Sequence, residues 1–164
     1  MAASTLSVIL VFVYGTLKNG QPNHFWLQDR TNGVSKLLAN GKTNDRYPLV
    51  IGTRYNIPFL LDVPNTGHRI NGEIYHIDEK MLKNLDVLED HPNYYLRHQI
   101  NITDDDGFVH NCWTYFLKEY PEDFMDNRTM ISSYSNSKEM PYILPADRDP
   151  AIPAKDDLDY RPPQ

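Results

Sequence analysis

The first strongly apolar segment of the chain runs from Val8 to Tyr14 and is followed by Gly15. Its seven residues are almost all β-branched, leucine or aromatic, with no charged residue among them. A short continuous run of this kind, stopped by a glycine, is typical of a strand that is buried on both faces. We therefore predict a strand at the centre of a sheet here.

Further β-rich runs follow, separated by clusters of Gly, Pro, Asn and Asp that are typical of turns. They cover residues 47–51, 58–63, 70–77, 95–102 and 111–117. The Asp-Gly pair that ends the segment 104–107 tolerates the positive φ of tight turns, so a hairpin is predicted between the last two runs. Together these strands predict a curled sheet or a barrel.

One helix is predicted over residues 79–90. Asp78 can cap its first turn, and Pro92 prevents its continuation. The apolar residues that recur at helical spacing are Met81, Leu82, Leu85 and Leu88.

Glu89 falls on the apolar face of this helix, four residues after Leu85, whereas Lys80, Lys83, Asp86 and Asp90 point elsewhere. A carboxylate on an apolar face is poorly solvated, which raises its pKa and suits it to transfer protons near neutral pH. Glu89 is therefore our candidate general acid and base. The alternative is that Glu89, at the helix end, bends out to water, and periodicity does not decide between the two.

The segment from Pro141 to the end contains six prolines and few apolar residues. Such a composition buries too little surface to offset the entropy of ordering, so we expect an extended or partly disordered tail over 141–164. The remainder shows no internal repeat. We interpret residues 1–164 as a single domain with a core at about 7–120.

Composition and charge exclude several classes of protein. The formal net charge is −6 among 164 residues, with no local stripe of Lys and Arg, which argues against a nucleic-acid partner. The longest apolar run is about a third of the ~20 residues that a membrane-spanning helix needs. Cys112 is the only cysteine, so no intrachain disulfide can form, and we expect a cytoplasmic protein.

Two further places could carry chemistry. The loop Tyr14, Gly15, Thr16, Leu17 follows the buried strand, and its glycine lets backbone N–H groups approach a ligand. The alternative is an ordinary strand-to-loop turn. Glu73 lies in a predicted strand on the face opposite Ile74, where a solvated residue is the favoured interpretation.

Metal and nucleophile motifs are missing from the sequence. The six histidines show no HExxH or paired-ligand spacing, so we expect no metal and no other cofactor. No GxSxG motif supports a serine nucleophile, and Cys112 lies in an apolar segment that is typical of a packed core.

The segment from Phe12 to His24, Phe-Val-Tyr-Gly-Thr-Leu-Lys-Asn-Gly-Gln-Pro-Asn-His, resembles the signature of the γ-glutamylcyclotransferases. Its Gly-Gln-Pro-Asn-His extension and the segments 47–51, 56–58 and 72–75 most resemble the γ-glutamylaminecyclotransferase branch. Matching residues run from Leu10 to about Leu117.

The resemblance implies an α+β fold, a small mixed or antiparallel β-barrel with flanking short helices. It aligns Leu85–Glu89 with the family helix that carries the catalytic glutamate, and so selects Glu89 over Glu73. It also implies that the loop Tyr14–Leu17 holds the γ-glutamyl head of a substrate. Tyr95 and Arg97 match a family Tyr-x-Arg pattern and are expected to support the pocket, and Tyr134 is a candidate for closing it.

By the same resemblance, the expected reaction converts γ-glutamylamines such as ε-(γ-glutamyl)-lysine into 5-oxoproline and a free amine. The substrate's own α-amine would attack its γ-carbonyl, without metal or water. One alternative is a γ-glutamylcyclotransferase that acts on γ-glutamyl amino acids or glutathione. Another is a non-catalytic binding protein on the same fold. A small-molecule ligand, a monomer and no membrane partner are expected in the enzymatic cases.

Overall fold

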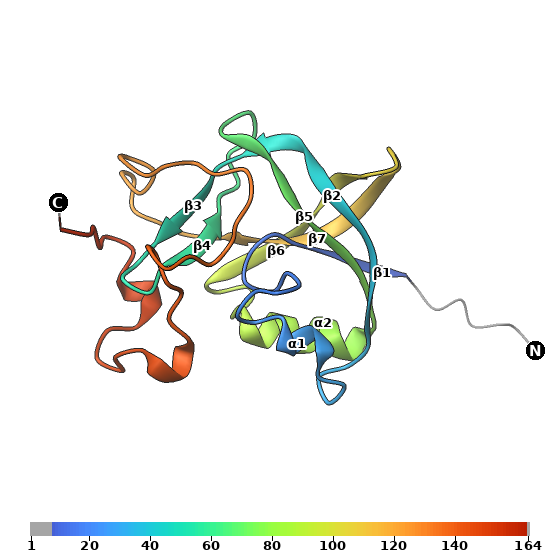
Figure 1. The fold of residues 1–164 in the computed structure, drawn as a ribbon, viewed down its shortest axis with the longest axis horizontal. Helices are drawn as coiled ribbons and strands as arrows, with labels where there is room; N and C mark the ends of the chain where they lie inside the picture. The colour runs from blue at the N-terminus through green and yellow to red at the C-terminus, as the bar shows by residue number, and fades with distance from the viewer. Residues whose placement is uncertain (1–7, 164) are drawn as a thin grey trace, which may run out of the picture.

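The computed structural model of the protein describes residues 8–163. Within them, five strands form a closed barrel in the order β1–β5–β2–β6–β7 (Figure 1). The barrel strands are β1 (Ile9–Val13), β2 (Ser35–Tyr47), β5 (His68–Ile77), β6 (Tyr95–Asp104) and β7 (Val109–Leu117). A two-stranded ribbon of β3 (Leu49–Gly52) and β4 (Ile57–Leu60) lies beside the barrel. The predicted small barrel of mixed strand direction is confirmed.

Strand β1 is buried on both faces, as the sequence predicts. Phe12 packs into a cluster with residues of β5, β6 and β7, while Val11 and Val13 join a second cluster that includes residues of helix α2. β1 pairs antiparallel with β5 and parallel with β7, where Val11 lies opposite Trp113. This parallel pairing closes the barrel.

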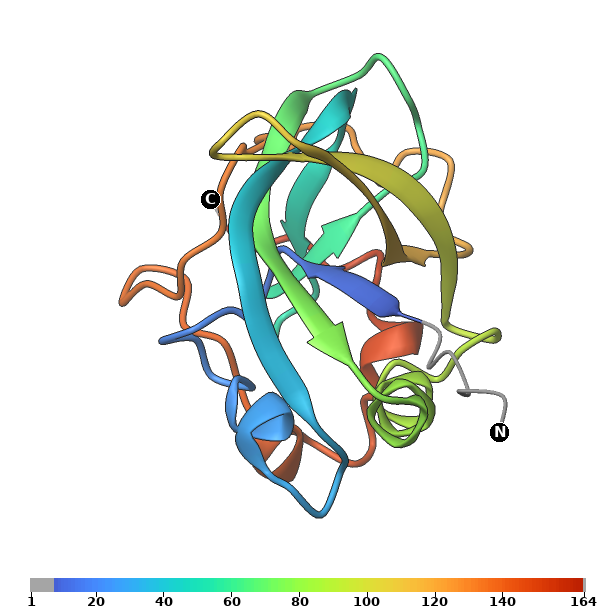
Figure 2. The same cartoon turned by 90° about the vertical axis from the view of Figure 1, so that its right-hand side faces the viewer.

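Two α-helices of the described chain lie at the same end of the barrel, α1 (Phe25–Gln28) and α2 (Glu79–Leu88) (Figure 2). The side chain of Asp78 caps α2 by accepting from the Met81 N–H at 2.9 Å. α2 ends at Leu88, two residues before the predicted end, because Glu89 is the C-cap and Asp90 has a φ of 49°. Neither helix combines the length and the apolar character that crossing a bilayer requires.

The hairpin between β6 and β7 is confirmed. The strands pair from Tyr95 opposite Leu117 to Thr103 opposite Val109. Gly107 has a φ of 90°, which the predicted turn requires.

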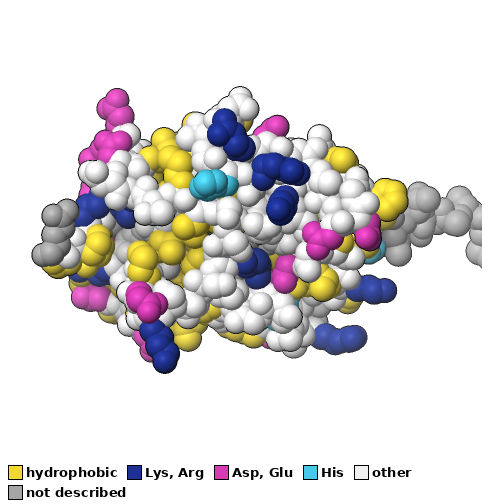
Figure 3. Space-filling model, turned by 45° about the horizontal axis from the view of Figure 1, so that its top comes forward, with side chains coloured by type: hydrophobic (Ala, Val, Ile, Leu, Met, Phe, Trp, Pro, Cys, Tyr) yellow, Lys and Arg dark blue, Asp and Glu magenta, His cyan; other side chains and the backbone are white. Residues whose placement is uncertain are grey.

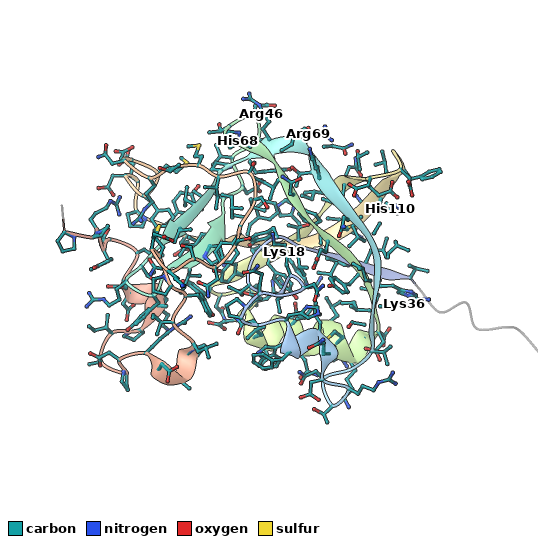
Figure 4. The ribbon with its side chains drawn as sticks, in the orientation of Figure 1. Lys18, Lys36, Arg46, His68, Arg69 and His110 are labelled. Carbon is teal, nitrogen blue, oxygen red and sulfur yellow. The ribbon has the colours of Figure 1, made fainter. Side chains whose placement is uncertain are left out.

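The outer surface of β2 and β5 is basic at its upper edge, although the protein as a whole is acidic (Figures 3 and 4). Arg46 and Arg69 donate from their guanidinium groups to the carbonyls of Asn65 and Thr43, at 2.7 and 2.9 Å. The two guanidinium groups therefore stabilise the backbone at Asn65 and Thr43. Strand β2 itself was not predicted.

The C-terminal segment is packed rather than loose. In residues 141–163 regular structure is limited to two short 3-10 helices, Pro145–Asp147 and Ala154–Asp156. Even so, Leu158 is buried, and the Asp157 carboxylate accepts from the backbone N–H and the guanidinium of Arg54 at 2.9 to 3.0 Å. These contacts are mostly polar, and most of the segment's side chains stay exposed or half-buried.

Candidate active site

A pocket of about 130 Å³ lies where four parts of the chain meet. They are the loop after β1, the end of α2, the start of β6 and the C-terminal segment, and residues of β1, β4 and β7 complete the lining. Of the residues that the sequence proposed for a site, the pocket brings together Tyr14, Gly15, Thr16, Leu17, Glu89 and Tyr95. These residues lie far apart in the sequence, and the barrel fold brings them together.

The backbone N–H groups of the loop over residues 15–17 do not take part in the hydrogen bonds that hold this loop. Its carbonyls are already bound: that of Thr16 accepts from the Asn23 N–H at 2.8 Å, and that of Leu17 from His24 Nδ1 at 2.8 Å. Among the described residues, no acceptor bonds the three N–H groups. Adjacent free N–H groups form a site for a carboxylate or an oxyanion.

Glu89 supplies the carboxyl group of the pocket. As the C-cap of α2 it follows the buried Leu85, whose carbonyl accepts from the Glu89 N–H at 2.9 Å. Part of the residue is exposed, but its carboxyl group is enclosed by protein, and this desolvation raises the pKa of Glu89 from 4.5 to about 7. Such a group both accepts and donates protons near neutral pH. The Glu89 side chain therefore lines the pocket.

Buried tyrosines surround this carboxyl group. The Tyr14 hydroxyl donates to the Tyr115 carbonyl at 2.6 Å, which joins the loop after β1 to β7. Burial, with a smaller contribution from the Glu89 charge, raises the pKa of Tyr14 well above its usual range, and desolvation does the same for Tyr95. Both phenols are therefore neutral near pH 7. Neither places a second charge beside Glu89, the one carboxyl group among the described residues that line the pocket.

Arg97 does not line the pocket but supports its wall. Its Nε and Nη2 donate to the Asp86 carboxylate at 2.7 and 3.1 Å, and the Tyr115 hydroxyl donates to the same carboxylate at 2.7 Å. The guanidinium also lies 4.3 Å above the ring of Trp113. Asp86 lies off the apolar face of α2, as predicted, and these three donors offset the desolvation of its half-buried carboxylate.

Glu73 and Tyr134 lie outside the pocket. Glu73 accepts from the Asn19 N–H at 2.8 Å and from the Tyr75 hydroxyl at 3.0 Å, so it ties the loop after β1 to β5 rather than standing free in solvent. Tyr134 is 1% exposed in the apolar cluster that contains Phe12. Tyr134 is therefore not one of the residues that line the pocket.

The pocket's outer wall, which sequence reasoning missed, comes from Tyr142, Pro145 and Arg148. Asn23 joins the two walls, since its Nδ2 donates to Thr16 Oγ1 at 3.0 Å and to the Tyr142 hydroxyl at 2.9 Å. Tyr142, Pro145 and Arg148 belong to a proline-rich segment whose apolar residues follow no regular period. An aromatic residue and an arginine six positions apart were the available signal.

Metal-ligand clusters and the thiol of Cys112 are the remaining groups that could carry chemistry. Residues 8–163 hold no cluster of three His, Cys, Asp or Glu side chains that could bind a metal ion. Cys112 is fully buried, and desolvation raises the pKa of its thiol to about 12. Such a thiol is not a nucleophile near neutral pH.

A family model described as gamma-glutamyl cyclotransferase, AIG2-like, matches residues 11–136. The chain belongs to this family. The loop after β1 and Glu89 lie inside the matched range, whereas Tyr142 and Arg148 lie beyond it. The family is one of cyclotransferase enzymes.

Individual relatives agree with this assignment. Gamma-glutamylaminecyclotransferase B of Danio rerio is 45% identical over 131 residues, covering 77% of this chain and 69% of the relative. Troponin C-akin-1 protein of Drosophila melanogaster is 47% identical over 152 residues, covering 92% and 90%. The crystal structure of an AIG2-like protein from Mus musculus superposes with a TM-score of 0.80 at 35% identity, covering 86% of this chain and 99% of that one.

Proposed function

We propose that the protein is a γ-glutamylamine cyclotransferase that converts substrates such as ε-(γ-glutamyl)-lysine into 5-oxoproline and a free amine. The observation that carries this proposal is the enclosed Glu89 carboxyl group, with a pKa of about 7, in the same pocket as the free N–H groups of residues 15–17. An isolated proton carrier next to an anion-binding loop is what an intramolecular acyl transfer requires.

In the proposed reaction, the α-amine nitrogen of the substrate forms a bond to its own γ-carbonyl carbon. Glu89, as carboxylate, takes the proton that the amine loses. The tetrahedral intermediate then breaks its bond to the leaving nitrogen, and Glu89 returns the proton to that nitrogen. The products are 5-oxoproline and the free amine, and no water is consumed. Because nucleophile and electrophile belong to one molecule, proximity supplies much of the rate.

The loop over residues 15–17 is assigned to the γ-glutamyl head. Its N–H groups have no internal acceptor, so binding an anion there breaks no existing hydrogen bond. Tyr14 and Tyr95 are proposed to exclude water from Glu89 and so to maintain its raised pKa. The amine class of leaving group is supported by the name of the Danio rerio relative, at 45% identity.

A side-by-side turnover assay tests the proposal. Purified protein is incubated with ε-(γ-glutamyl)-lysine, γ-glutamyl-alanine and glutathione, and 5-oxoproline and the released amine are both measured. We expect equal amounts of 5-oxoproline and lysine from the first substrate at the highest kcat/KM. Preference for either of the others would assign a γ-glutamyl amino acid or glutathione activity. Binding without turnover would indicate a non-catalytic protein, and release of glutamate would indicate hydrolysis.

A further inference from the structure

The outer wall of the pocket carries an unpaired positive charge. Among the described residues that line the pocket, Arg148 is the one cation and Glu89 the one carboxylate. No described carboxylate lies within 4.0 Å of the Arg148 guanidinium. Arginines inside pockets commonly pair with a carboxylate or phosphate, so this one is available to a ligand.

The guanidinium of Arg148 is held in place by its neighbours. Its Nε donates to the Ile143 carbonyl at 2.9 Å, and its Nη2 donates to the Tyr142 hydroxyl at 2.9 Å. It also lies 5.1 Å from the ring centre of Tyr55 and 5.3 Å from that of Tyr142. These two hydrogen bonds leave three of its five N–H groups without an acceptor among the described residues. An oriented guanidinium with free donors matches the geometry of a carboxylate.

Tyr94 lines the same pocket as the two charged residues. Its hydroxyl is buried and has no hydrogen-bond partner among the described residues. The pKa of Tyr94 is raised mainly by burial, and the Arg148 charge lowers it while the Glu89 charge raises it. Arg148 and Glu89 do not pair with each other, since no nitrogen–oxygen distance between the two described side chains is within 4.0 Å. Glu89, Tyr94 and Arg148 therefore face one shared pocket.

We propose that Arg148 is a specificity-determining residue that binds a carboxylate carried by the leaving amine, with the Tyr94 hydroxyl as a second donor. This inference rests on the proposed function, which assigns the γ-glutamyl head to the loop over residues 15–17 on the opposite wall. A leaving group that departs from the scissile bond at Glu89 then points toward Tyr94 and Arg148. The favoured substrates are γ-glutamyl conjugates of amines that also bear a carboxylate.

Arg148 lies outside the range 11–136 that the family match covers. Leaving-group recognition by the C-terminal segment is thus separate from the reaction centre that the family match contains. This separation allows the two parts to be tested independently.

The test compares two substrates that differ in one group: ε-(γ-glutamyl)-lysine and the same compound with the lysine carboxylate converted to a carboxamide. For the wild-type protein, we expect the carboxamide to have a higher KM and a kcat/KM lower by about 10- to 100-fold, the effect of losing a charged hydrogen bond. The contact exists in the bound substrate as well as in the transition state, so the change should appear in KM rather than in kcat.

The variant Arg148→Gln should lower kcat/KM for the carboxylate substrate at least 10-fold more than for the carboxamide, so that the two substrates become nearly equal. Arg148→Lys keeps the charge and should restore part of the difference. Tyr94→Phe should reduce the discrimination by less than Arg148→Gln does. Lys155→Gln is the matched control, because it removes one positive charge from an exposed position of the same segment.

Two results would overturn the inference. Equal losses for both substrates in Arg148→Gln would mean that Arg148 binds the γ-glutamyl head or only supports the fold. Equal kcat/KM values for the two substrates in the wild type would mean that no leaving-group carboxylate is recognised. Failure of the proposed function looks different, because neither substrate would then yield 5-oxoproline.

Discussion

The two walls of the pocket are built in different ways. The inner wall, formed by the loop after β1 and by Glu89, rests on the barrel core and on α2, where Leu85 and Val11 are fully buried. The outer wall, with Tyr142 and Arg148, is positioned by hydrogen bonds and aromatic contacts of a segment with little regular structure.

This difference indicates that the residues proposed for chemistry rest on a packed core, whereas those proposed for selectivity belong to a segment with little regular structure. A densely packed core fixes positions to a fraction of an ångström, which the proposed proton transfer requires. A segment held by a few polar contacts can change without disturbing that core. We therefore expect changes in the inner wall to affect kcat, and changes in the outer wall to affect the choice of leaving group.

The largest expected effect comes from Glu89→Gln. The amide fits the same space but cannot carry a proton, so 5-oxoproline release should fall by about 1000-fold or more. Circular dichroism and thermal unfolding serve as controls and should show a folded protein that is at least as stable as the wild type near pH 8. A folded Glu89→Gln variant with near-normal turnover would disprove the assignment of Glu89.

The pH dependence is the second way to test the inner wall. The proposed step needs the Glu89 carboxylate, so kcat/KM should rise with pH and reach half of its plateau near pH 7, the pKa of that group. Stability should change in the opposite direction. Because folding raises the pKa of Glu89 from 4.5 to about 7, its contribution is most favourable below pH 4.5 and is lost as the pH rises toward 7. A rising limb centred near pH 4.5 would show that the carboxyl group is solvated.

Gly15→Ala should have an intermediate effect. Its φ is not in the left-handed region, but an added Cβ would lie 3.0 Å from Pro58 Cγ and force the loop or the proline to move. Misplaced oxyanion donors typically cost ~100-fold in rate. Cys112→Ser changes a buried barrel residue instead and should lower stability by about 1 kcal/mol while turnover is kept.

Both variants are assayed at equal concentrations of folded protein with ε-(γ-glutamyl)-lysine. An inactive Cys112→Ser protein beside an active Gly15→Ala protein would replace the proposed mechanism with one that uses the thiol.

The smallest expected effect comes from loosening the outer wall through Asp157→Asn. This change removes the charge that Arg54 binds at 2.9 Å, in an ion pair whose arginine is 40% exposed. A pair of this kind contributes about 1 kcal/mol, so KM should rise by at most ~5-fold while kcat stays constant. Steady-state kinetics measure both constants. A large fall in kcat would show that the two walls are coupled.

The sequence predicted the elements that carry a local signal: a continuous apolar run, apolar residues at helical spacing, or a turn pair such as Asp-Gly. Strand β1, helix α2 and the β6–β7 hairpin were found in this way. Strand β2 was missed because most of its residues are polar and exposed, with Gly41, Thr43 and Tyr47 as its buried positions. Its pairing with β5 and β6 is a property of the closed barrel rather than of its own composition.

For the candidate site, helical spacing put Glu89 on the apolar face, since face and spacing are local properties, and the family resemblance then selected it over the solvated alternative and over Glu73. Arg148 could not be placed in this way, because its position depends on Tyr142 and Tyr55, and through Asn23 on the loop after β1. Contacts between distant segments leave no periodic signal. Tyr134 was chosen for the outer wall instead and lies in the barrel core.

The parallel pairing of β1 with β7 has a consequence for how the protein forms during synthesis. Tyr14 bonds to a carbonyl 101 residues later in the chain, and Val11 lies opposite Trp113. Contacts of such long sequence separation form late and slow the folding of a domain. A ribosome-bound chain that ends before residue 109 already contains the loop after β1 and Glu89. It lacks β7, the strand that pairs with both β6 and β1 and so closes the barrel. Such a nascent chain should be unable to hold a γ-glutamyl ligand until β7 has emerged.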